Sequence, residues 1–189
     1  MTRPRIYLAG PDVFLPNARE VGAAKRRLCS EAGLDGVFPL DGDLALDGLH
    51  KHEQARLIYQ SCVQMMHSCD AAIANLTPFR GVSADVGTAF EVGFMRALGR
   101  PVLGYSNAPD NLEARSTIYR AGPRLGFDGD ADAVEVEDFD LADNLMIDIA
   151  IQSSGGRVIV HDAPAENRMA DLSAFQACLG EMKRLLSGN

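Results

Sequence analysis

The feature that most constrains the fold is an alternation of short apolar runs with amphipathic stretches between residues 5 and 105. The apolar runs predict strands at 5–10, around 37–38, at 71–76 and at 101–105. The stretches between them have helical spacing and predict helices over 17–32, 50–68 and 85–98. Strands that alternate with helices form parallel sheets through right-handed crossovers. We therefore expect an α/β fold, a doubly wound (flavodoxin-like or Rossmann-like) open parallel sheet with helices on both faces.

Two of the predicted helices have sequence features that suggest their ends and faces. The segment 85–98 can be capped at its start by Asp85 and ended by Gly99. Its apolar residues fall on one face, which carries Val86, Phe90, Gly93, Phe94 and Ala97. In 50–68, the buried side is expected to carry Ile58, Val63 and Met66.

The alternating pattern weakens after residue 105. Residues 106–140 are polar, Gly-rich and acidic, and the one element expected there is a short strand at 134–136. Two later segments, 141–152 and 168–186, have helical spacing. The chain has 189 residues and no internal repeat, a size that one hydrophobic core can stabilise. We expect a single domain over residues 1–189.

The charge balance argues against several classes of partner. Lys and Arg number 18 against 26 Asp and Glu, which gives a net charge of -8, and the basic residues are scattered. Such a surface repels a polynucleotide, so no nucleic-acid partner is expected. The N-terminal sequence lacks the apolar core of a signal peptide, and no run approaches the ~20 apolar residues of a membrane span. We expect a cytoplasmic protein without membrane association.

The sequence contains no fingerprint of a metal or cofactor site. The four cysteines form no CxxC pair and have no accompanying histidine spacing, so free structural thiols are expected. His50 and His52 are interpreted as solvated loop residues. Neither GxxxxGK[ST] nor GxGxxG occurs, so ATP and dinucleotide fingerprints are missing. No cofactor and no metal are expected.

Glu91 is the residue that most needs an explanation. It lies within residues 86–94, VGTAFEVGF, whose other side chains are apolar, small or a threonine. A carboxylate seldom occupies such surroundings without a partner or a specific task. Helical side chains lean toward the N-terminus, so Glu91 is expected to overlie Gly87, whose missing side chain leaves space for a ligand. The alternative is a structural carboxylate held by the backbone or an arginine.

Ligands of open parallel sheets bind beyond the carboxyl ends of the strands. This rule singles out the loops 10–17 and 77–85 and the stretch after residue 105. Asp85 can converge with Glu91 if it caps the helix that carries Glu91, and capping alone is its plainer role. Two carboxylates at a cleft suit glycosyl chemistry with retention, because one can attack the anomeric carbon while the other orients or protonates the leaving group.

Three motifs resemble those of the nucleoside 2-deoxyribosyltransferase family. They are IYLAGPDVF at 6–14, ANLTPFRG at 74–81 and DVGTAFEVGF at 85–94. The resemblance runs through most of the chain. It implies transfer of the 2-deoxyribosyl group between nucleobases by a retaining double displacement through a covalent glutamyl intermediate. The implied substrates are a deoxyribonucleoside and a free nucleobase.

The resemblance also implies roles for individual residues. Glu91 matches the nucleophilic glutamate of the DVG-x-x-x-E pattern, and Asp85 would bind or polarise the nucleoside. Tyr7 would steady the nucleophile, although an ordinary core aromatic is its alternative. Asn144 and Met146 lie in a segment like the one by which a neighbouring subunit completes the pocket, which implies a homodimer or higher homo-oligomer. The other substrate-binding residues expected are Gly10, Asp12, Phe14, Asn75, Phe79, Arg80 and Gly87.

One position departs from the family pattern. Some members have a proton-donating aspartate eight residues before the Asp that opens the central strand, and counting back from Asp70 leads to Cys62. A thiol with an ordinary pKa near 8.5 is a poor substitute. Asp12 is then the candidate for the proton or the hydrogen bond, and a turn-forming Asp is its alternative. The departure and the two loop motifs favour purines as substrates. Phe79 could stack on a base and Arg80 could reach a hydroxyl, or both could order their loop.

Two other functions stay open at this point. Related enzymes hydrolyse deoxynucleoside monophosphates, which requires a phosphate cradle, but GPDVFLPNA has Asp12 and no cation. Hydrolysis of a deoxynucleoside or deoxynucleotide is the first alternative. A non-catalytic nucleoside-binding module is the second, and the retained Glu91 counts against it.

Overall fold

The computed structural model describes residues 2–120 and 135–188, and its centre is a five-stranded parallel sheet. The strands are β1 (Arg5–Ala9), β2 (Asp35–Val37), β3 (Ala71–Asn75), β4 (Val102–Ser106) and β5 (Val158–Val160). Their order across the sheet is β2-β1-β3-β4-β5, and every pairing is parallel. This architecture confirms the predicted α/β fold with an open parallel sheet.

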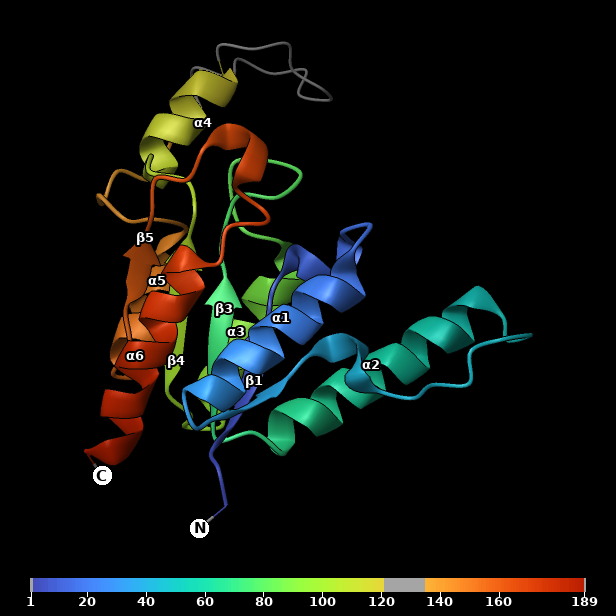
Figure 1. The fold of residues 1–189 in the computed structure, drawn as a ribbon. Coiled ribbons are helices and arrows are strands. Elements are labelled where there is room, and N and C mark those ends of the chain that lie inside the picture. Colours follow the sequence, from blue (N-terminus) through green and yellow to red (C-terminus); the bar gives the residue numbers. More distant parts are fainter. Residues whose placement is uncertain (1, 121–134, 189) are drawn as a thin grey trace.

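Helices cover both faces of the sheet (Figure 1). They are α1 (Ala18–Glu31), α2 (Lys51–His67), α3 (Val86–Ala97), α4 (Leu112–Arg120), α5 (Leu145–Ser153) and α6 (Ser173–Ser187). Short 3-10 helices lie at Pro11–Phe14 (η1), Pro39–Asp41 (η2) and Ala165–Asn167 (η4). One core cluster joins α1 and α6 to the sheet, and the other joins α3, α5 and the end of α2 to the opposite face.

The alternation of side chains along β1 sends Tyr7 to the face that α3 covers. Ile6 and Leu8 belong to the cluster under α1 and α6, whereas Tyr7 belongs to the cluster under α3 and α5. Successive residues of a strand point to opposite faces, so a shift of one residue would reverse this arrangement. The pairing of Tyr7 with Val37 on one side and with Ala72 on the other fixes the register. Tyr7 is therefore held beneath α3.

Two predicted helix faces are confirmed only in part, because Val63 and Met66 of α2 and Phe94 of α3 pack against the core but other residues of these faces do not. In α2, Met66 is buried but Ile58 is 44% exposed, because most of this helix extends beyond the edge of the sheet (Figure 1). In α3, the buried residues are Thr88, Val92 and Met95, whereas Val86 is 85% exposed and Phe90 is 50% exposed. An apolar side chain on a helix does not by itself indicate the face that meets the core.

The second half of the chain departs most from prediction. The strand β5 and the helix α4 lie where no element is expected from the pattern. Of the expected strand at 134–136, residue 134 lies outside the described residues, and residues 135 and 136 form no strand. The helices expected at 141–152 and 168–186 begin later, as α5 and α6. Within the described parts of the chain, no helix combines the length and the apolar character needed to cross a membrane.

Candidate active site

The order of the sheet makes the carboxyl ends of β1 and β3 the place where a ligand is expected, and we call the region between the loops that follow these strands the crevice. The chain leaves β1 toward β2 on one side, and later elements lie on the other side of β1. Parallel sheets bind ligands at such a reversal, because the two loops separate there. The loops involved are 10–17 and 76–85, two of the three that are expected from the sequence.

Glu91 of α3 accepts a hydrogen bond from the buried phenol of β1. The distance from Tyr7 Oη to Glu91 Oε1 is 2.5 Å. Tyr7 is fully buried, whereas Glu91 is only partly buried. No other hydrogen bond reaches the Glu91 carboxylate from the described residues, and Oε2 is not among the buried atoms that lack a partner. We infer that Oε2 is the oxygen that solvent or a ligand can reach.

The surroundings of Glu91 change its acidity in opposing ways. Burial raises the pKa of its carboxyl, the hydrogen bond from Tyr7 lowers it, and the nearby Asp85 carboxylate raises it, with a net result of about 7. Burial and the Glu91 charge also raise the pKa of Tyr7 well above its ordinary value. Tyr7 therefore keeps its proton and acts as a donor throughout the neutral range. Glu91 is an acid that ionises near neutral pH, as a tuned catalytic group does.

Cys62 of α2 lies next to the same pair. The Tyr7 hydroxyl and the Glu91 carboxylate are both close enough to its thiol to affect the pKa of that thiol. Burial is the largest cause that raises this pKa above its ordinary value. A thiol thus lies near the Tyr7–Glu91 pair at the position where the family resemblance implies an aspartate in some members.

Asp85 caps the helix that carries Glu91. Its Oδ2 accepts hydrogen bonds from the amides of Gly87 at 3.0 Å and Thr88 at 3.3 Å. Asp85 therefore caps α3, which is the plainer role expected for it. It also raises the pKa of Glu91, which indicates that the two carboxylates are neighbours. A Cβ atom on Gly87 would lie 2.9 Å from Asp85 Oδ2. Glycine at this position keeps the approach to the Asp85 carboxylate open.

The loop after β1 is anchored by a buried ion pair. Lys25 Nζ of α1 lies 2.7 Å from Asp12 Oδ2, and both side chains are at most 2% exposed. Asn75 Nδ2 donates to the same carboxylate at 3.2 Å. Gly10 has a φ of 153°, and a Cβ there would lie 2.5 Å from Asp12 Oδ2. Gly10, Asp12 and Asn75 are thus brought together, but as a packed unit that joins the two loops.

This ion pair counts against Asp12 as the source of a proton, because its carboxylate accepts from an ammonium and an amide in the interior. Lys25 is not predicted from the sequence as a functional or structural residue. Its position could have indicated one, because Lys25 lies between Val21 and Cys29 at intervals of four, on the buried stripe of α1. A lysine in such a stripe indicates a buried acidic partner.

An aromatic and cationic cluster connects the tips of the two loops. The rings of Phe14 and Phe79 are stacked, with centroids 5.5 Å apart and planes 11° apart. The guanidinium carbon of Arg80 lies 4.6 Å from the centroid of each ring. Phe14 is 53% exposed, so the cluster presents aromatic surface at the mouth of the crevice. Phe14, Phe79 and Arg80, three of the residues expected to bind the substrate, therefore lie together.

Asn144 and Met146 lie at the start of α5. Asn144 caps this helix by accepting from the Met146 amide at 3.0 Å, and its Nδ2 donates to Glu137 Oε1 at 2.5 Å. Met146 is 73% exposed. No hydrogen bond joins either residue to Glu91 or Tyr7 within the described chain. Within the described residues of one chain, their side-chain hydrogen bonds stay at the start of α5 or reach Glu137.

The loop between β3 and α3 is held from the second half of the chain. The Asp143 carboxylate accepts from the Ser83 hydroxyl and, at 2.8 Å, from the Ala84 amide. Arg115 of α4 donates to the Val82 carbonyl at 2.7 Å and lies 3.6 Å from Asp143. The sequence pattern singles out neither Arg115 nor Asp143, because nothing local to residues 106–145 indicates which loop they meet.

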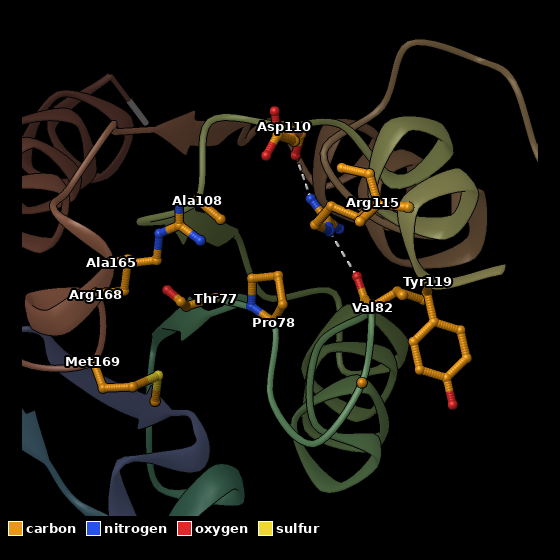
Figure 2. A pocket seen from close by; sticks show the side chains of 12 residues that line it. Thr77, Pro78, Val82, Ala108, Asp110, Arg115, Tyr119, Ala165, Arg168 and Met169 are labelled. Atoms are coloured by element: carbon orange, nitrogen blue, oxygen red, sulfur yellow. Dashed lines mark hydrogen bonds between the residues drawn. The ribbon is translucent and has the colours of Figure 1, made fainter. Parts of the chain in front are cut away.

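A cavity of about 470 Å³ is lined in part by the loop between β3 and α3 (Figure 2). Neither Tyr7 nor Glu91 lines it. Its lining comes from the loops after β3 and β4, from α4 and from η4, and consists of Thr77, Pro78, Gly81, Val82, Ala108, Asp110, Arg115, Ile118, Tyr119, Ala165, Arg168 and Met169. Residues 2–120 and 135–188 contain no group of three or more His, Cys, Asp or Glu side chains that could hold a metal ion.

Comparison with known proteins agrees with this geometry. The fold is that of an α/β protein with an open parallel sheet. A family model described as nucleoside 2-deoxyribosyltransferase matches residues 6–146, and the chain belongs to this family.

Individual relatives support the assignment. The 2-desoxiribosyltransferase from Leishmania mexicana is 29% identical, with a TM-score of 0.60 over 89% of this chain and 96% of that one. An uncharacterized protein of Schizosaccharomyces pombe is 33% identical over 171 residues, which cover 83% of this chain and 81% of that protein. A conserved protein from Enterococcus faecalis, 18% identical, shares the fold with a TM-score of 0.55 over 97% of this chain and 99% of that one. The family and fold are thereby established.

Replacing Glu91 by Gln should stabilise the fold at alkaline pH. The pKa of Glu91 is raised in the folded state from 4.5 to about 7, so its contribution to stability is lost as pH rises between these values. Gln keeps an acceptor for Tyr7 but cannot ionise. Glu91→Gln should exceed the parent in free energy of unfolding by roughly 3 kcal/mol at pH 8 and match it at pH 4. Urea denaturation at both pH values measures this difference, with the exposed Glu20→Gln as control. Equal stabilities at pH 8 would contradict the assigned desolvation.

Removing the Lys25 ammonium should destabilise the protein strongly. Lys25→Met leaves the Asp12 carboxylate buried without its cation, which typically costs about 3–5 kcal/mol. Lys25→Met combined with Asp12→Asn should recover much of that loss, because no charge stays buried. Arg27→Met, which removes an exposed cation of the same helix, should cost less than about 1 kcal/mol. Similar losses for Lys25→Met and Arg27→Met would show that the ion pair does not anchor the loop.

Proposed function

We propose that this protein transfers the 2-deoxyribosyl group from one nucleobase to another, with Glu91 as the covalent nucleophile. The observation that carries the proposal is the pairing of Glu91 Oε1 with Tyr7 while Oε2 stays without a partner among the described residues. One oxygen is positioned and the other is available for attack. Membership of the family supports a deoxyribosyl substrate.

The first half of the reaction forms the glycosyl-enzyme. Oε2 of the ionised Glu91 attacks C1' of the bound nucleoside, and the electron pair of the C1'–N bond leaves with the base, which takes up a proton from water. Tyr7 holds Oε1 and fixes the angle of attack. Asp85 orients the nucleoside at the start of α3, beside the open space above Gly87. The developing positive charge on the sugar is stabilised by these two carboxylates.

The second half reverses the first with another base. A ring nitrogen of the incoming base attacks C1', the bond to Glu91 breaks, and the nitrogen releases its proton to water. Two inversions give net retention, so the product has the configuration of the substrate. The stacked Phe14 and Phe79 rings, with Arg80 against them, offer a surface for a flat base at the crevice. A large base covers more of that surface, which favours purines.

A second copy of the chain is proposed to complete the pocket. Met146 is 73% exposed at the start of α5, and among the described residues no hydrogen bond joins it or Asn144 to Glu91. We propose that Asn144 and Met146 of a partner subunit contact the 5'-hydroxyl of the sugar.

Mixing inactive Glu91→Gln with inactive Met146→Ala under subunit exchange should restore activity, because one site of each mixed dimer is intact. Exchange without restored activity would exclude a shared pocket.

Hydrolysis is the alternative that one observation favours. Arg80 brings a cation next to Phe14 of the first loop, which the loop sequence itself lacks. A 5'-phosphate could meet a guanidinium there. The same assay run with 2'-deoxyinosine and with its 5'-monophosphate separates the possibilities, because free hypoxanthine from the monophosphate alone would identify a nucleotide hydrolase.

The transfer reaction itself gives the most direct functional prediction. With 2'-deoxyinosine and free adenine, the protein should form 2'-deoxyadenosine, detected by liquid chromatography. Glu91→Gln should lower the rate on the order of 10³-fold or more, because the amide cannot form the intermediate. Glu20→Gln serves as the matched control and should retain the parent rate. Equal rates for the parent and Glu91→Gln would refute the assigned nucleophile, and binding without turnover in both proteins would indicate a non-catalytic module.

The pH dependence should follow the ionisation of Glu91. Because the pKa of Glu91 is about 7 and the carboxylate is the reactive form, kcat/KM should rise about tenfold per pH unit below 7 and level off above about 8. Tyr7→Phe removes the hydrogen bond that lowers this pKa, so the inflection should move to higher pH. Tyr119→Phe, at an exposed tyrosine of α4, is the control and should leave the profile in place. A rate that falls as pH rises through 7 would mean that Glu91 acts in its protonated form.

A further inference from the structure

The cavity of about 470 Å³ beyond the 77–84 loop takes no part in the proposed reaction. Tyr7, Cys62 and Glu91 do not line this cavity. The stacked rings of Phe14 and Phe79 and the Arg80 side chain do not line it either. Its size falls within the range of about 300–1,000 Å³ that small-molecule sites occupy. Four separate elements converge on it, so a bound molecule would contact the loops after β3 and β4 together with α4 and η4.

Arg168 is the polar group in this lining that lacks a partner. Its Nε is buried without a hydrogen bond, and its guanidinium forms no ion pair with the described residues. Its backbone is fixed, because its carbonyl accepts from Asn107 Nδ2 at 2.7 Å. Figure 2 shows the guanidinium extending toward Ala108. A buried donor without an acceptor is costly, typically about 1–3 kcal/mol and more when charged. A ligand that supplies an acceptor would remove this cost.

Arg115 of the same lining differs from Arg168, because it is fully occupied. It donates to the carbonyls of Val82, Asp110 and Ala142 and lies 3.6 Å from the Asp143 carboxylate. The one acidic residue of the lining, Asp110, is exposed and lies beside Arg115 (Figure 2). The uncompensated positive charge of the cavity therefore lies at Arg168.

The rest of the lining is largely apolar. Pro78, Val82 and Met169 contribute to it, together with two side chains of α4 that are unusually exposed for their size. Ile118 is 68% exposed and Tyr119 is 56% exposed. An apolar body placed against them would cover surface that water now contacts, which favours binding.

We propose that this cavity binds a small organic oxyanion, a carboxylate or a phosphate monoester on a ring-sized apolar body, with Arg168 as its anion-binding residue. A guanidinium matches either oxyanion in a two-pronged arrangement of hydrogen bonds. The apolar body packs against Ile118 and Tyr119. The proposed site is distinct from the crevice that contains Glu91. The loop at residues 76–85 borders both.

Isothermal titration calorimetry with two defined probes tests the proposal on the whole protein. Phenyl phosphate and benzoate present the two oxyanions on the same ring, and phenol presents the ring alone. At least one of the two anions should bind saturably and about tenfold or more tighter than phenol. The tighter of the two identifies the source of the anion. Absence of saturable binding for both, or binding of phenol at equal strength, would overturn the proposal.

Variants locate the binding. Arg168→Gln should weaken the better probe at least about tenfold, and Ile118→Glu should do the same by adding a negative charge at an exposed position that the fold tolerates. Lys183→Gln removes an exposed cation of α6 and should change affinity less than about twofold. Equal affinity of the parent and of both variants for the probe would refute the site. Two variants are used so that the test still holds if one of them folds poorly.

A final comparison separates this site from the crevice. In Glu91→Gln, which should bind 2'-deoxyinosine without turnover, saturating nucleoside should leave the affinity for the probe within about twofold. Competition between the nucleoside and the probe would place the probe in the crevice and contradict a separate site. Failure of the transfer reaction would leave this result unaffected, because the calorimetric measurement requires no catalysis.

Discussion

The hydrogen bond between Tyr7 and Glu91 is the interaction on which the rest of the site depends. It joins a strand in the middle of the sheet to a helix on one face, and within residues 2–120 and 135–188 Tyr7 is the one hydrogen-bond partner of a largely desolvated carboxylate. Because the Tyr7 phenol keeps its proton, the bond restrains one oxygen of Glu91 over the whole neutral range. Burial makes the carboxylate costly to ionise and correspondingly reactive once ionised. In the proposed mechanism, the fold thus gives up stability at Glu91 in exchange for reactivity.

Buried charges elsewhere keep the crevice in shape. The Lys25–Asp12 pair anchors the loop after β1 and holds Asn75, so that the ends of β1 and β3 move as one unit. Asp143 and Arg115 anchor the loop that leads to Asp85. Such pairs contribute little net stability, but breaking one leaves an uncompensated charge in the interior. They therefore make alternative positions of the loops expensive, and they separate the crevice from the cavity at Arg168.

The sequence predicts the fold well where local pattern and packing agree. Alternating apolar and helical segments up to residue 105 give β1, β3, β4 and the helices between them, because buried parallel strands are apolar on both faces. Glu91 is found for a related reason, since a charge inside an apolar helix stands out. The strand β5 is three residues long and only partly buried, so its composition gives no comparable signal.

Other features depend on contacts that no local pattern encodes. Ile58 is exposed because α2 extends past the sheet, which helical spacing cannot indicate. Phe90 of α3 is half exposed although its side chain is apolar. The partners of Asp12, Asp143 and Arg168 come from segments distant in the chain, and only the tertiary structure reveals which are paired and which are not. Of the residues expected to form the site, Phe14, Phe79 and Arg80 lie together, as do Gly10, Asp12 and Asn75 in a packed unit, whereas Asn144 and Met146 lie apart at the start of α5.

The measurement closest to the central claim is the mass of the protein during turnover. Acid quenching after mixing with 2'-deoxyinosine alone, without an acceptor base, should trap protein heavier by one 2-deoxyribosyl group, and peptide mapping should locate the added mass at Glu91. Glu91→Gln should show no such species. An adduct at another residue, or rapid turnover with no adduct at any time point, would contradict a covalent role for this carboxylate.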